Sequence, residues 1–470
     1  MTGSVERGCG PASGMAAAVA FFLISGLYGC ATFPEVGATA APGNAQPVRM
    51  AGARGPLSHQ ESAAVLARLK GRQGTPDILA RHVAIEEAVV GRPLVTGNRV
   101  KLLKDGPETY QAMTAAIGAA RDHIHFETYI FEDDVIGQKF AHLLLRKQAE
   151  GVQVSLIYDS VGTLHVPKEF FQRLADSGIR VLEFNPVNPL TAKKGWRINQ
   201  RHHRKLLVVD GRIAFVGGIN ISDVYSGGSS AGHVRASDGK STNWRDTHVS
   251  IEGPVVREFQ ELFLEIWKKG GGKALPAKAY FPQLAPAGEE VVRAVDSKAD
   301  DSLSPIYVTF LSAIASAEQH VHITVAYFVP DPQSLRALTE AAQRGVDVRI
   351  ILPGHTDFWA VFHAGRSHYT DLLQAGIQIY ERRGALLHSK TVLIDGVWSS
   401  VGSTNWDARS FLHNNELNAV VLGRSFAREM QAMFEKDLEN SERIELDKWQ
   451  SRSLLDRIKE SFARIWEYWL

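Results

Sequence analysis

HRKLLVVDGRIAFVGGIN (residues 203–220) and HSKTVLIDGVWSSVGSTN (residues 388–405) are two copies of one pattern, and they decide the fold. Each copy reads H-x-K-x-x-x-x-D and continues, at the same spacing, to a glycine and an asparagine. The matched residues are His203, Lys205, Asp210, Gly217 and Asn220 in the first copy, and His388, Lys390, Asp395, Gly402 and Asn405 in the second. One such pattern carries little weight in a chain with 17 histidines, whereas two copies in the same register indicate a duplicated functional unit.

Each copy has the composition of a β-hairpin. Apolar runs at 205–209 and 390–394 end in Asp-Gly, a dipeptide typical of hairpin turns, and apolar runs return at 213–216 and 398–401. Side chains alternate between the faces of a strand, so the histidine and the lysine two residues later point to the same side. We predict a structural role for Asp210 and Asp395, in which each carboxylate caps the backbone of its own turn.

A second repeat extends the duplication. Residues 116–131 (AIGAARDHIHFETYIF) align without a gap to residues 313–328 (AIASAEQHVHITVAYF). In both halves an expected helix and a strand that opens with Gly-Val-x-Val come next. This order is typical of βαβ units. We therefore predict an α/β fold of two homologous domains with mostly parallel sheets, packed about a pseudo-twofold axis so that both His-Lys pairs share one cleft.

The expected boundaries follow from composition. They are 1–29 for a signal peptide, 30–58 for an Ala/Gly/Pro-rich tether, 59–94 for an N-terminal helical segment, 95–270 for the first domain, 271–287 for a linker, 288–445 for the second domain and 446–470 for a C-terminal amphipathic helix.

The N-terminus suggests export. Residues 15–29 form an apolar run that is short for a membrane span and suited to a signal peptide. The run ends in Leu-Tyr-Gly-Cys, which resembles a bacterial lipobox and predicts lipidation of Cys30. We expect a membrane-anchored protein that faces the periplasm, with the outer membrane favoured because Ala31 replaces an aspartate retention signal. An uncleaved anchor stays an alternative, because the positive charge before the run is weak.

The charge and cysteine content narrow the function. The net charge of the 470-residue chain is +1, so no overall field attracts nucleic acid, and we expect no nucleic-acid partner. The two cysteines, Cys9 and Cys30, leave the body of the chain without a thiolate metal site. We expect neither a metal ion nor another cofactor.

The paired residues match the needs of metal-free phosphodiester cleavage. Such a reaction requires a nucleophile, a proton donor for the leaving alkoxide and cations or amides that stabilise charge on the phosphoryl oxygens. His203 and His388 can supply the first two functions. The two lysines and two asparagines of the copies can supply the third. The alternative, core histidines beside solvent-facing lysines, would not explain the matched pairs.

Two acidic residues can orient the histidines. Asp246 and Glu416 occupy matching places in the two halves, each just before an apolar strand. We predict that they accept a hydrogen bond from an imidazole Nδ1, as a third residue does at other histidine sites. The alternative is a strand-edge acid with no such role.

These motifs, with FETYIFEDD (126–134), WRDTHVSIEGP (244–254) and RGVDVRIILPG (344–354), resemble the phospholipase D superfamily and are most similar to bacterial cardiolipin synthases of that type. The resemblance implies a two-step transfer without a metal. One histidine becomes a covalent phosphohistidine, and the other protonates the departing alcohol and then activates an incoming alcohol or water. Phospholipids and a membrane surface are the implied partners.

Several finer expectations follow. We favour His203 as the nucleophile, because His202, Arg204 and an upstream basic loop flank it, and His388 as the general acid; the usual assignment in the superfamily agrees. The expected substrate-binding residues are Lys194 and Arg201 in the basic region, and Gly218 and Ser403 in the glycine motifs.

Two segments outside the motifs carry predictions as well. Residues 225–240 occur only in the first half, are rich in Gly and Ser, and are expected to hang over the cleft as a mobile loop. Residues 454–470 form an expected amphipathic helix whose apolar stripe, Ile458, Phe462, Ile465, Trp466 and Trp469, we predict to pack on the body of the protein instead of lying on lipid.

The leading hypothesis is a phosphatidyltransferase, a cardiolipin synthase that condenses phosphatidylglycerol with a second phospholipid. A phospholipase D hydrolase is the alternative, because water can capture the same intermediate. A phosphodiester nuclease fits the charge less well. A non-catalytic lipid-binding scaffold would not need both intact His-Lys pairs.

Overall fold

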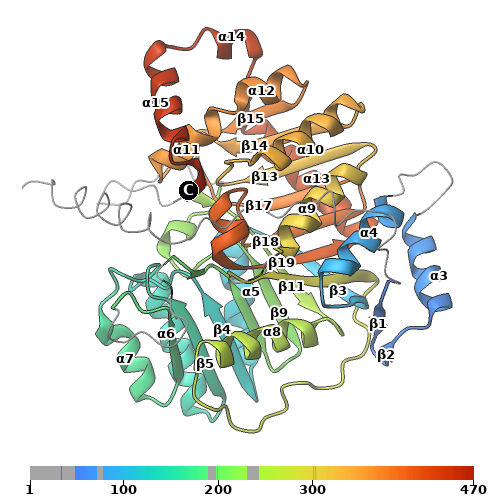
Figure 1. Ribbon diagram of the computed structural model, residues 1–470. Coiled ribbons are helices and arrows are strands. Elements are labelled where there is room, and N and C mark those ends of the chain that lie inside the picture. The colour runs from blue at the N-terminus through green and yellow to red at the C-terminus, as the bar shows by residue number, and fades with distance from the viewer. Residues whose placement is uncertain are drawn as a thin grey trace, which may run out of the picture. The chain divides into compact units, whose positions relative to one another are not determined.

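In the computed structural model, the two hairpins that carry the H-x-K segments occupy matching places in one continuous sheet (Figure 1). The structure describes residues 33, 48–70, 78–188, 197, 199–229, 243–299, 301 and 303–470. The predicted signal peptide, most of the tether, Cys30, Lys194 and most of the 225–240 segment lie outside these residues. The predicted domain boundaries therefore stay predictions.

In the first half the strands lie in the order β6, β5, β4, β8, β9, β11, β3. Their bounds are β3 (Leu94–Lys104), β4 (His123–Thr128), β5 (Gln153–Asp159), β6 (Arg180–Phe184), β8 (Leu206–Val209), β9 (Ile213–Gly217) and β11 (Thr247–Glu252). Strands β4, β5 and β6 run parallel, and the other neighbours run antiparallel.

The second half repeats this order as β15, β14, β13, β17, β18, β19, β12. Their bounds are β12 (Glu290–Ser297), β13 (His320–Val325), β14 (Asp347–Pro353), β15 (Gln378–Arg382), β17 (Lys390–Ile394), β18 (Trp398–Gly402) and β19 (Asn414–Leu422), with β20 (Ser441–Arg443) beyond β15. The antiparallel pair β3–β12 joins the two halves. The predicted α/β fold with two homologous halves is confirmed. The prediction of mostly parallel sheets is confirmed only for β4–β5–β6 and β13–β14–β15. The motif hairpins β8–β9 and β17–β18 are antiparallel, because a tight turn reverses the direction of the chain.

Helices cover both faces of the sheet. Helices α5 (Asp105–Ala119), α6 (Val135–Ala149) and α7 (Lys168–Asp176) pack on one face of the first half. On the other face, α8 (Val256–Lys269) and α13 (Arg424–Glu439) share a hydrophobic cluster that continues across both halves. Strand β8 shows the alternation that separates the layers. Leu206 and Val208 belong to the shared cluster, and Leu207 belongs to the cluster beneath α5.

The second half carries α9 (Pro305–Ser316), α10 (Pro332–Gln343), α11 (Trp359–Arg366) and α12 (Tyr369–Gln374). The N-terminal segment contributes β1 (Met50–Gly52), β2 (Gly55–Pro56), α3 (His59–Lys70) and α4 (Ile78–Val89). Helix α4 packs on α9, and the buried His82 Nδ1 lies 2.7 Å from Ser312 Oγ. The N-terminal segment therefore contacts the second half, although the first half follows it in sequence. Residues 271–287 contain neither helix nor strand.

The motif aspartates differ in detail from their prediction. Asp210 and Asp395 have φ values of 53° and 52°, as tight hairpin turns require. Their carboxylates do not cap their own turns. Asp210 accepts hydrogen bonds from the backbone N–H groups of residues 121–123 at 2.8–3.0 Å, and Asp395 accepts them from residues 318–320 at 2.8–3.0 Å. Each aspartate therefore ties the end of a motif strand to the start of β4 or β13.

The C-terminal segment corrects another prediction. After α14 (Leu446–Gln450), α15 (Leu454–Arg464) turns Ala463 and Glu460 toward the protein. The apolar stripe faces outward, with Ile458 54%, Phe462 55% and Ile465 71% exposed. The prediction that this stripe packs on the body of the protein is therefore wrong for these three residues. Trp466 does pack on the body, against Val361 and Ala364 of α11. Among the described residues, no helix has the length and apolar character needed to cross a bilayer.

Candidate active site

Two short strand pairs connect the halves beside the motif histidines. Strand β7 (Arg201–His202) pairs with the start of β19, and β10 (Trp244–Arg245) pairs with β16 (Leu386–Leu387). The backbone N–H of His203 donates to the carbonyl of Asn415 at 3.0 Å, and that of His388 donates to the carbonyl of Arg245 at 2.7 Å. Each histidine is thus held by the residue that precedes the carboxylate of the other half.

The backbone contacts produce crossed imidazole–carboxylate pairs. His203 Nδ1 lies 3.0 and 3.1 Å from the two carboxylate oxygens of Glu416, and His388 Nδ1 lies 2.7 Å from Asp246 Oδ2. All four side chains are buried. The sequence pointed to these two acids but not to the crossing. Neither half contains a complete pair, so the arrangement makes a single site.

Two residues predicted to bind substrate lie close to the carboxylates. Ser403 is fully buried, and its Oγ donates a hydrogen bond to Glu416 Oε2. At Gly218, an added Cβ would come within 2.3 Å of Asp246 Oδ1, so only glycine leaves room for this carboxylate. These contacts give both residues a role in positioning the acids, and substrate binding by either stays a prediction.

The lysines lie close to both halves of the site. Lys205 Nζ donates to the carbonyl of His203 at 2.5 Å, and Lys390 Nζ donates to the carbonyl of His388. Burial lowers the pKa of Lys205 to about 7; the charge of Glu416 offsets part of this effect and that of Lys390 adds to it. Burial lowers the pKa of Lys390 to about 8, although Asp246 and Glu416 favour its charged form. Both ammonium groups therefore gain stability from an anion in the site.

The imidazoles are held neutral. Burial lowers the pKa of His203 to about 4, with Glu416 opposing this shift and Lys205 adding to it. Burial, Lys390 and Lys205 lower the pKa of His388 well below its ordinary value. Neutral rings that donate Nδ1–H to a carboxylate have a free lone pair on Nε2, which is the form that attacks phosphorus.

The pKa values of the two carboxylates shift in opposite directions. Burial raises the pKa of Asp246 to about 6, and Lys390 offsets only part of this shift. Burial also acts to raise the pKa of Glu416, but His203 and Lys205 outweigh it, so its pKa lies below the ordinary value. Glu416 is thus the firmer anion of the pair.

The motif asparagines are both buried. Asn220 Oδ1 accepts from the backbone of Ile130 at 3.1 Å, and its Nδ2 donates to the Tyr225 hydroxyl at 3.1 Å. The Tyr225 hydroxyl in turn lies 3.3 Å from His388 Nδ1. A contact between Asn220 or Asn405 and phosphate stays a prediction. Tyr225 belongs to the site and not to the mobile loop that was expected to start with it.

The surroundings of the two imidazoles are unequal. The ring of Tyr129 lies 5.1 Å from that of His203. Arg409 lies near Tyr129 and donates a hydrogen bond to Asn199 at 2.9 Å. The ring of His388 is surrounded by Trp244, Tyr225 and Tyr327 at 5.1, 5.9 and 6.4 Å. Sequence reasoning missed these aromatic residues, although Tyr129 and Trp244 stand inside phrases that carry the resemblance.

Two of the cationic neighbours that were expected to favour His203 as nucleophile, His202 and Arg204, contact another acid, and most of the upstream basic loop lies outside the described residues. Arg204 and His202 contact the buried Glu127 at 2.8 and 3.3 Å, so both side chains are held by this acid of the first half. Arg201, predicted to bind a head group, is 1% exposed and contacts Asp159 at 3.4 Å. The described members of the basic cluster, Arg201, His202 and Arg204, therefore contact buried acids of the first half.

No group of three or more His, Cys, Asp or Glu side chains could hold a metal ion within the part of the chain that the structure describes. A metal-free reaction stays a prediction.

Comparisons with known proteins agree with this site. Residues 113–226 and 310–438 match the family described as cardiolipin synthase, PLD-like domain. Cardiolipin synthase 2 of Bacillus anthracis is 38% identical over 368 residues, which are 78% of this chain and 69% of that protein. Cardiolipin synthase A of Pseudomonas putida is 35% identical over 419 residues, 87% of this chain and 84% of that protein. Phosphatidylserine synthase of Haemophilus influenzae Rd KW20 shares the fold, with a TM-score of 0.59 and 13% identity, over 81% of this chain and 96% of that one.

Proposed function

The chain belongs to the family of cardiolipin synthases with PLD-like domains, and from that premise we propose that it transfers a phosphatidyl group from phosphatidylglycerol to a second phospholipid. The observation that carries the proposal is the pair of crossed contacts, His203 with Glu416 and His388 with Asp246. They join two neutral imidazoles and two lysines in one site, which suits attack at phosphorus and proton delivery to a leaving alcohol.

In the first step, His203 Nε2 attacks phosphorus and the bond between phosphorus and the glycerol oxygen breaks. Protonated His388 gives its Nε2 proton to that oxygen, so glycerol leaves as an alcohol. In the second step, neutral His388 takes the proton of an incoming lipid hydroxyl. The hydroxyl oxygen then bonds to phosphorus, and the phosphorus–nitrogen bond breaks.

The charges of the site are suited to an anionic substrate. Lys205 and Lys390 lie beside both imidazoles, and their lowered pKa values show that their charges are costly without an anion. A bound phosphodiester supplies the anion, raises the pKa values of both lysines and lets His388 take up the proton it must donate. The lysines then stabilise the charge on the phosphoryl oxygens.

We keep His203 as the nucleophile, but for a different reason. A phosphohistidine that retains its Nδ1 proton carries a positive ring, which an ionised carboxylate stabilises. Glu416, with its lowered pKa, meets that need better than Asp246, whose pKa is about 6. We therefore assign the proposed phosphohistidine to His203, the ring beside Glu416.

Membrane anchoring through Cys30 is part of the proposal and is tested separately. Labelling of cells with a clickable palmitate analogue should mark the full chain and leave a Cys30→Ser variant unmarked. An equal label on both chains would exclude Cys30 as the lipid site.

The transfer is tested with purified protein and vesicles of phosphatidylglycerol labelled in the head-group glycerol. We expect cardiolipin and free glycerol in equal amounts, with neither product from His203→Ala or His388→Ala. Phosphatidic acid in place of cardiolipin would identify a hydrolase. The absence of all three products would reject the proposal.

A further inference from the structure

Large exposed apolar side chains gather at one place on the surface. Ten such side chains occur among the described residues, and seven of them lie on α15 or at the N-terminal end of α11. These seven, named here the α15 patch, are Phe358, Trp359, Leu454, Leu455, Ile458, Phe462 and Ile465. At roughly 100 Å² of exposed surface each, these seven side chains expose about 700 Å² in total, a large apolar area for a soluble monomer.

The α15 patch belongs to one packed unit. Ala463 and Trp466 pack with Val361 and Ala364 of α11. Figure 1 shows α15 running down to α11, where the chain ends. The two helices therefore present their exposed side chains from one scaffold.

In the described part of the chain, the fold leaves most of the apolar stripe of α15 exposed. The side turned inward carries the small Ala463 and the buried Glu460, which is paired with Arg452 at 2.7 Å. Leu454, Leu455 and Ile458 remain 54–72% exposed. A helix that buries its small and charged side and exposes its bulky apolar side is suited to an apolar environment outside the protein.

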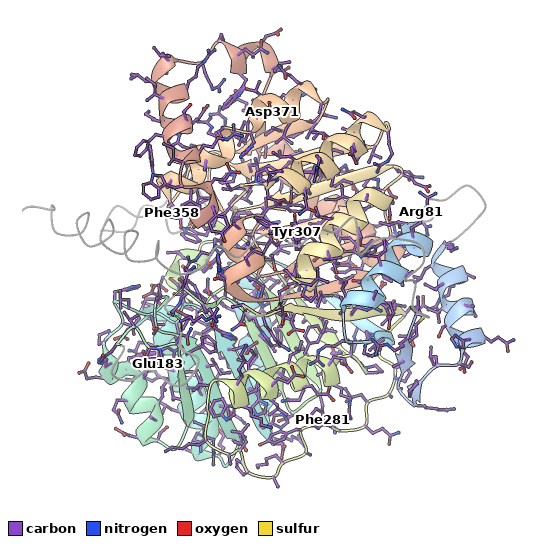
Figure 2. The ribbon with its side chains drawn as sticks, viewed as in Figure 1. Arg81, Glu183, Phe281, Tyr307, Phe358 and Asp371 are labelled. Carbon is purple, nitrogen blue, oxygen red and sulfur yellow. The ribbon has the colours of Figure 1, made fainter. Side chains whose placement is uncertain are left out.

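The α15 patch borders the catalytic centre. Phe358 follows Asp357, whose carboxylate accepts a hydrogen bond from the Tyr327 hydroxyl at 2.9 Å. The Tyr327 ring lies 6.4 Å from the ring of His388. Figure 2 shows Phe358 at the outer edge of the second half, on the side of the molecule where α15 ends in Figure 1. Two residues thus connect the patch to the histidine that handles the proton of the alcohol.

The polar groups around the stripe suit the lipid head-group region. Lys459 pairs with Asp456 at 3.3 Å, and Arg464 pairs with Glu467 at 3.6 Å. These pairs keep the rim polar without a large net charge. The 11-residue α15 can lie in the plane of an interface, with Leu, Ile and Phe below and the paired charges above.

We propose that the α15 patch docks on the head-group–acyl boundary of a phospholipid bilayer and holds the His388 side of the site against the membrane surface. The choice of lipid as the occupant rests on the proposed function. A phosphatidyltransferase needs the phosphodiester at its site while the acyl chains stay in the bilayer. Docking beside Tyr327 lets a head group reach His388 without extraction of the whole lipid.

A site-specific probe tests the docking without turnover. Phe462→Cys is labelled with the environment-sensitive dye NBD in a Cys9→Ser/Cys30→Ser full-length chain. Val135→Cys is the matched control, because Val135 is 76% exposed and lies in the first half. With phosphatidylcholine or phosphatidylglycerol vesicles, we expect a blue-shifted emission and quenching by nitroxide lipids at 462 and not at 135. Unchanged emission at 462, or equal insertion at both positions, would overturn the proposal.

A kinetic comparison separates docking from chemistry. Leu455→Gln/Ile458→Gln/Phe462→Gln should lower turnover of vesicle phosphatidylglycerol about 100-fold and leave turnover of monomeric short-chain phosphatidylglycerol nearly unchanged. The control is Val135→Gln/Leu164→Gln, which removes two apolar side chains of similar exposure outside the patch. Equal losses on both substrates would overturn the proposal. The proposal would also be overturned if the wild type formed a dimer without lipid and the triple variant were a monomer, since a second copy of the chain would then occupy the patch. Failure of all turnover would reject the proposed function alone, because the dye experiment would still decide the docking.

Discussion

Glu416→Gln replaces the carboxylate beside His203 with a neutral group of the same shape. The two Glu416 oxygens lie 3.0 and 3.1 Å from His203 Nδ1. A hydrogen bond to a charged group contributes about 1.5–3 kcal/mol, which corresponds to about 10- to 150-fold in rate. We expect kcat/KM on phosphatidylglycerol vesicles to fall by at least that factor. Loss of the correct imidazole tautomer would deepen the fall toward about 10⁴-fold.

The crossed arrangement makes this prediction specific. In ¹H–¹⁵N spectra of histidine-labelled protein, Glu416→Gln should shift the Nδ1–H signal of His203 and leave that of His388 in place. Asp246→Asn, the matched control, should do the reverse. Glu429→Gln, on the outer side of α13, should change neither signal nor rate. A Glu416→Gln variant that shifts only His388, or that loses less than about threefold in rate, would refute the crossed pairing.

Three further predictions follow. His203→Ala and His388→Ala should each remove nearly all turnover, and the double variant should be hardly worse, because residues that act as a unit are not additive; half activity in either single variant would indicate two independent sites. Turnover should persist after dialysis against EDTA, and loss that a divalent metal restores would contradict the metal-free reaction. The kcat/KM of the wild type should fall below pH of about 6, where Asp246 takes up a proton, and fall above pH 7–8, where Lys205 and then Lys390 lose theirs. In the pH profile of kcat, the alkaline fall should occur at a higher pH than in the profile of kcat/KM, since bound phosphodiester raises the lysine pKa values. A rate that does not change between pH 5 and pH 9 would contradict this assignment.

The local structure of the motifs could be predicted from sequence because each hairpin is determined by neighbouring residues. The expected strands at 390–394 and 213–216 coincide with β17 and with most of β9. The positive φ of Asp210 likewise follows from the Asp-Gly turn. The carboxylate partner of that aspartate was not predictable, because β4 comes to the turn only through the sheet.

The crossing of the carboxylates had no local signal. Asp246 stands in the same half as His203, and only the pairing of β7 with β19 and of β10 with β16 carries each acid to the other histidine. The pKa values of the site likewise depend on burial by both halves.

The outward face of α15 was missed for a related reason. Periodicity identifies an apolar stripe, but the direction in which it points is set by what the opposite side can pack against. Here Ala463 allows a close approach to α11, and Glu460 finds Arg452, so the small and charged side turned inward.

The central claim is one shared site with one covalent intermediate. Single-turnover reactions with ³²P-labelled phosphatidylglycerol should be stopped by a rapid denaturing quench at alkaline pH, which preserves phosphohistidine, and then digested and analysed by tandem mass spectrometry. We expect up to one phosphatidyl group per chain, always on His203, and none in the Lys205→Ala or His388→Ala variants. Label divided between His203 and His388, or approaching two groups per chain, would contradict the claim.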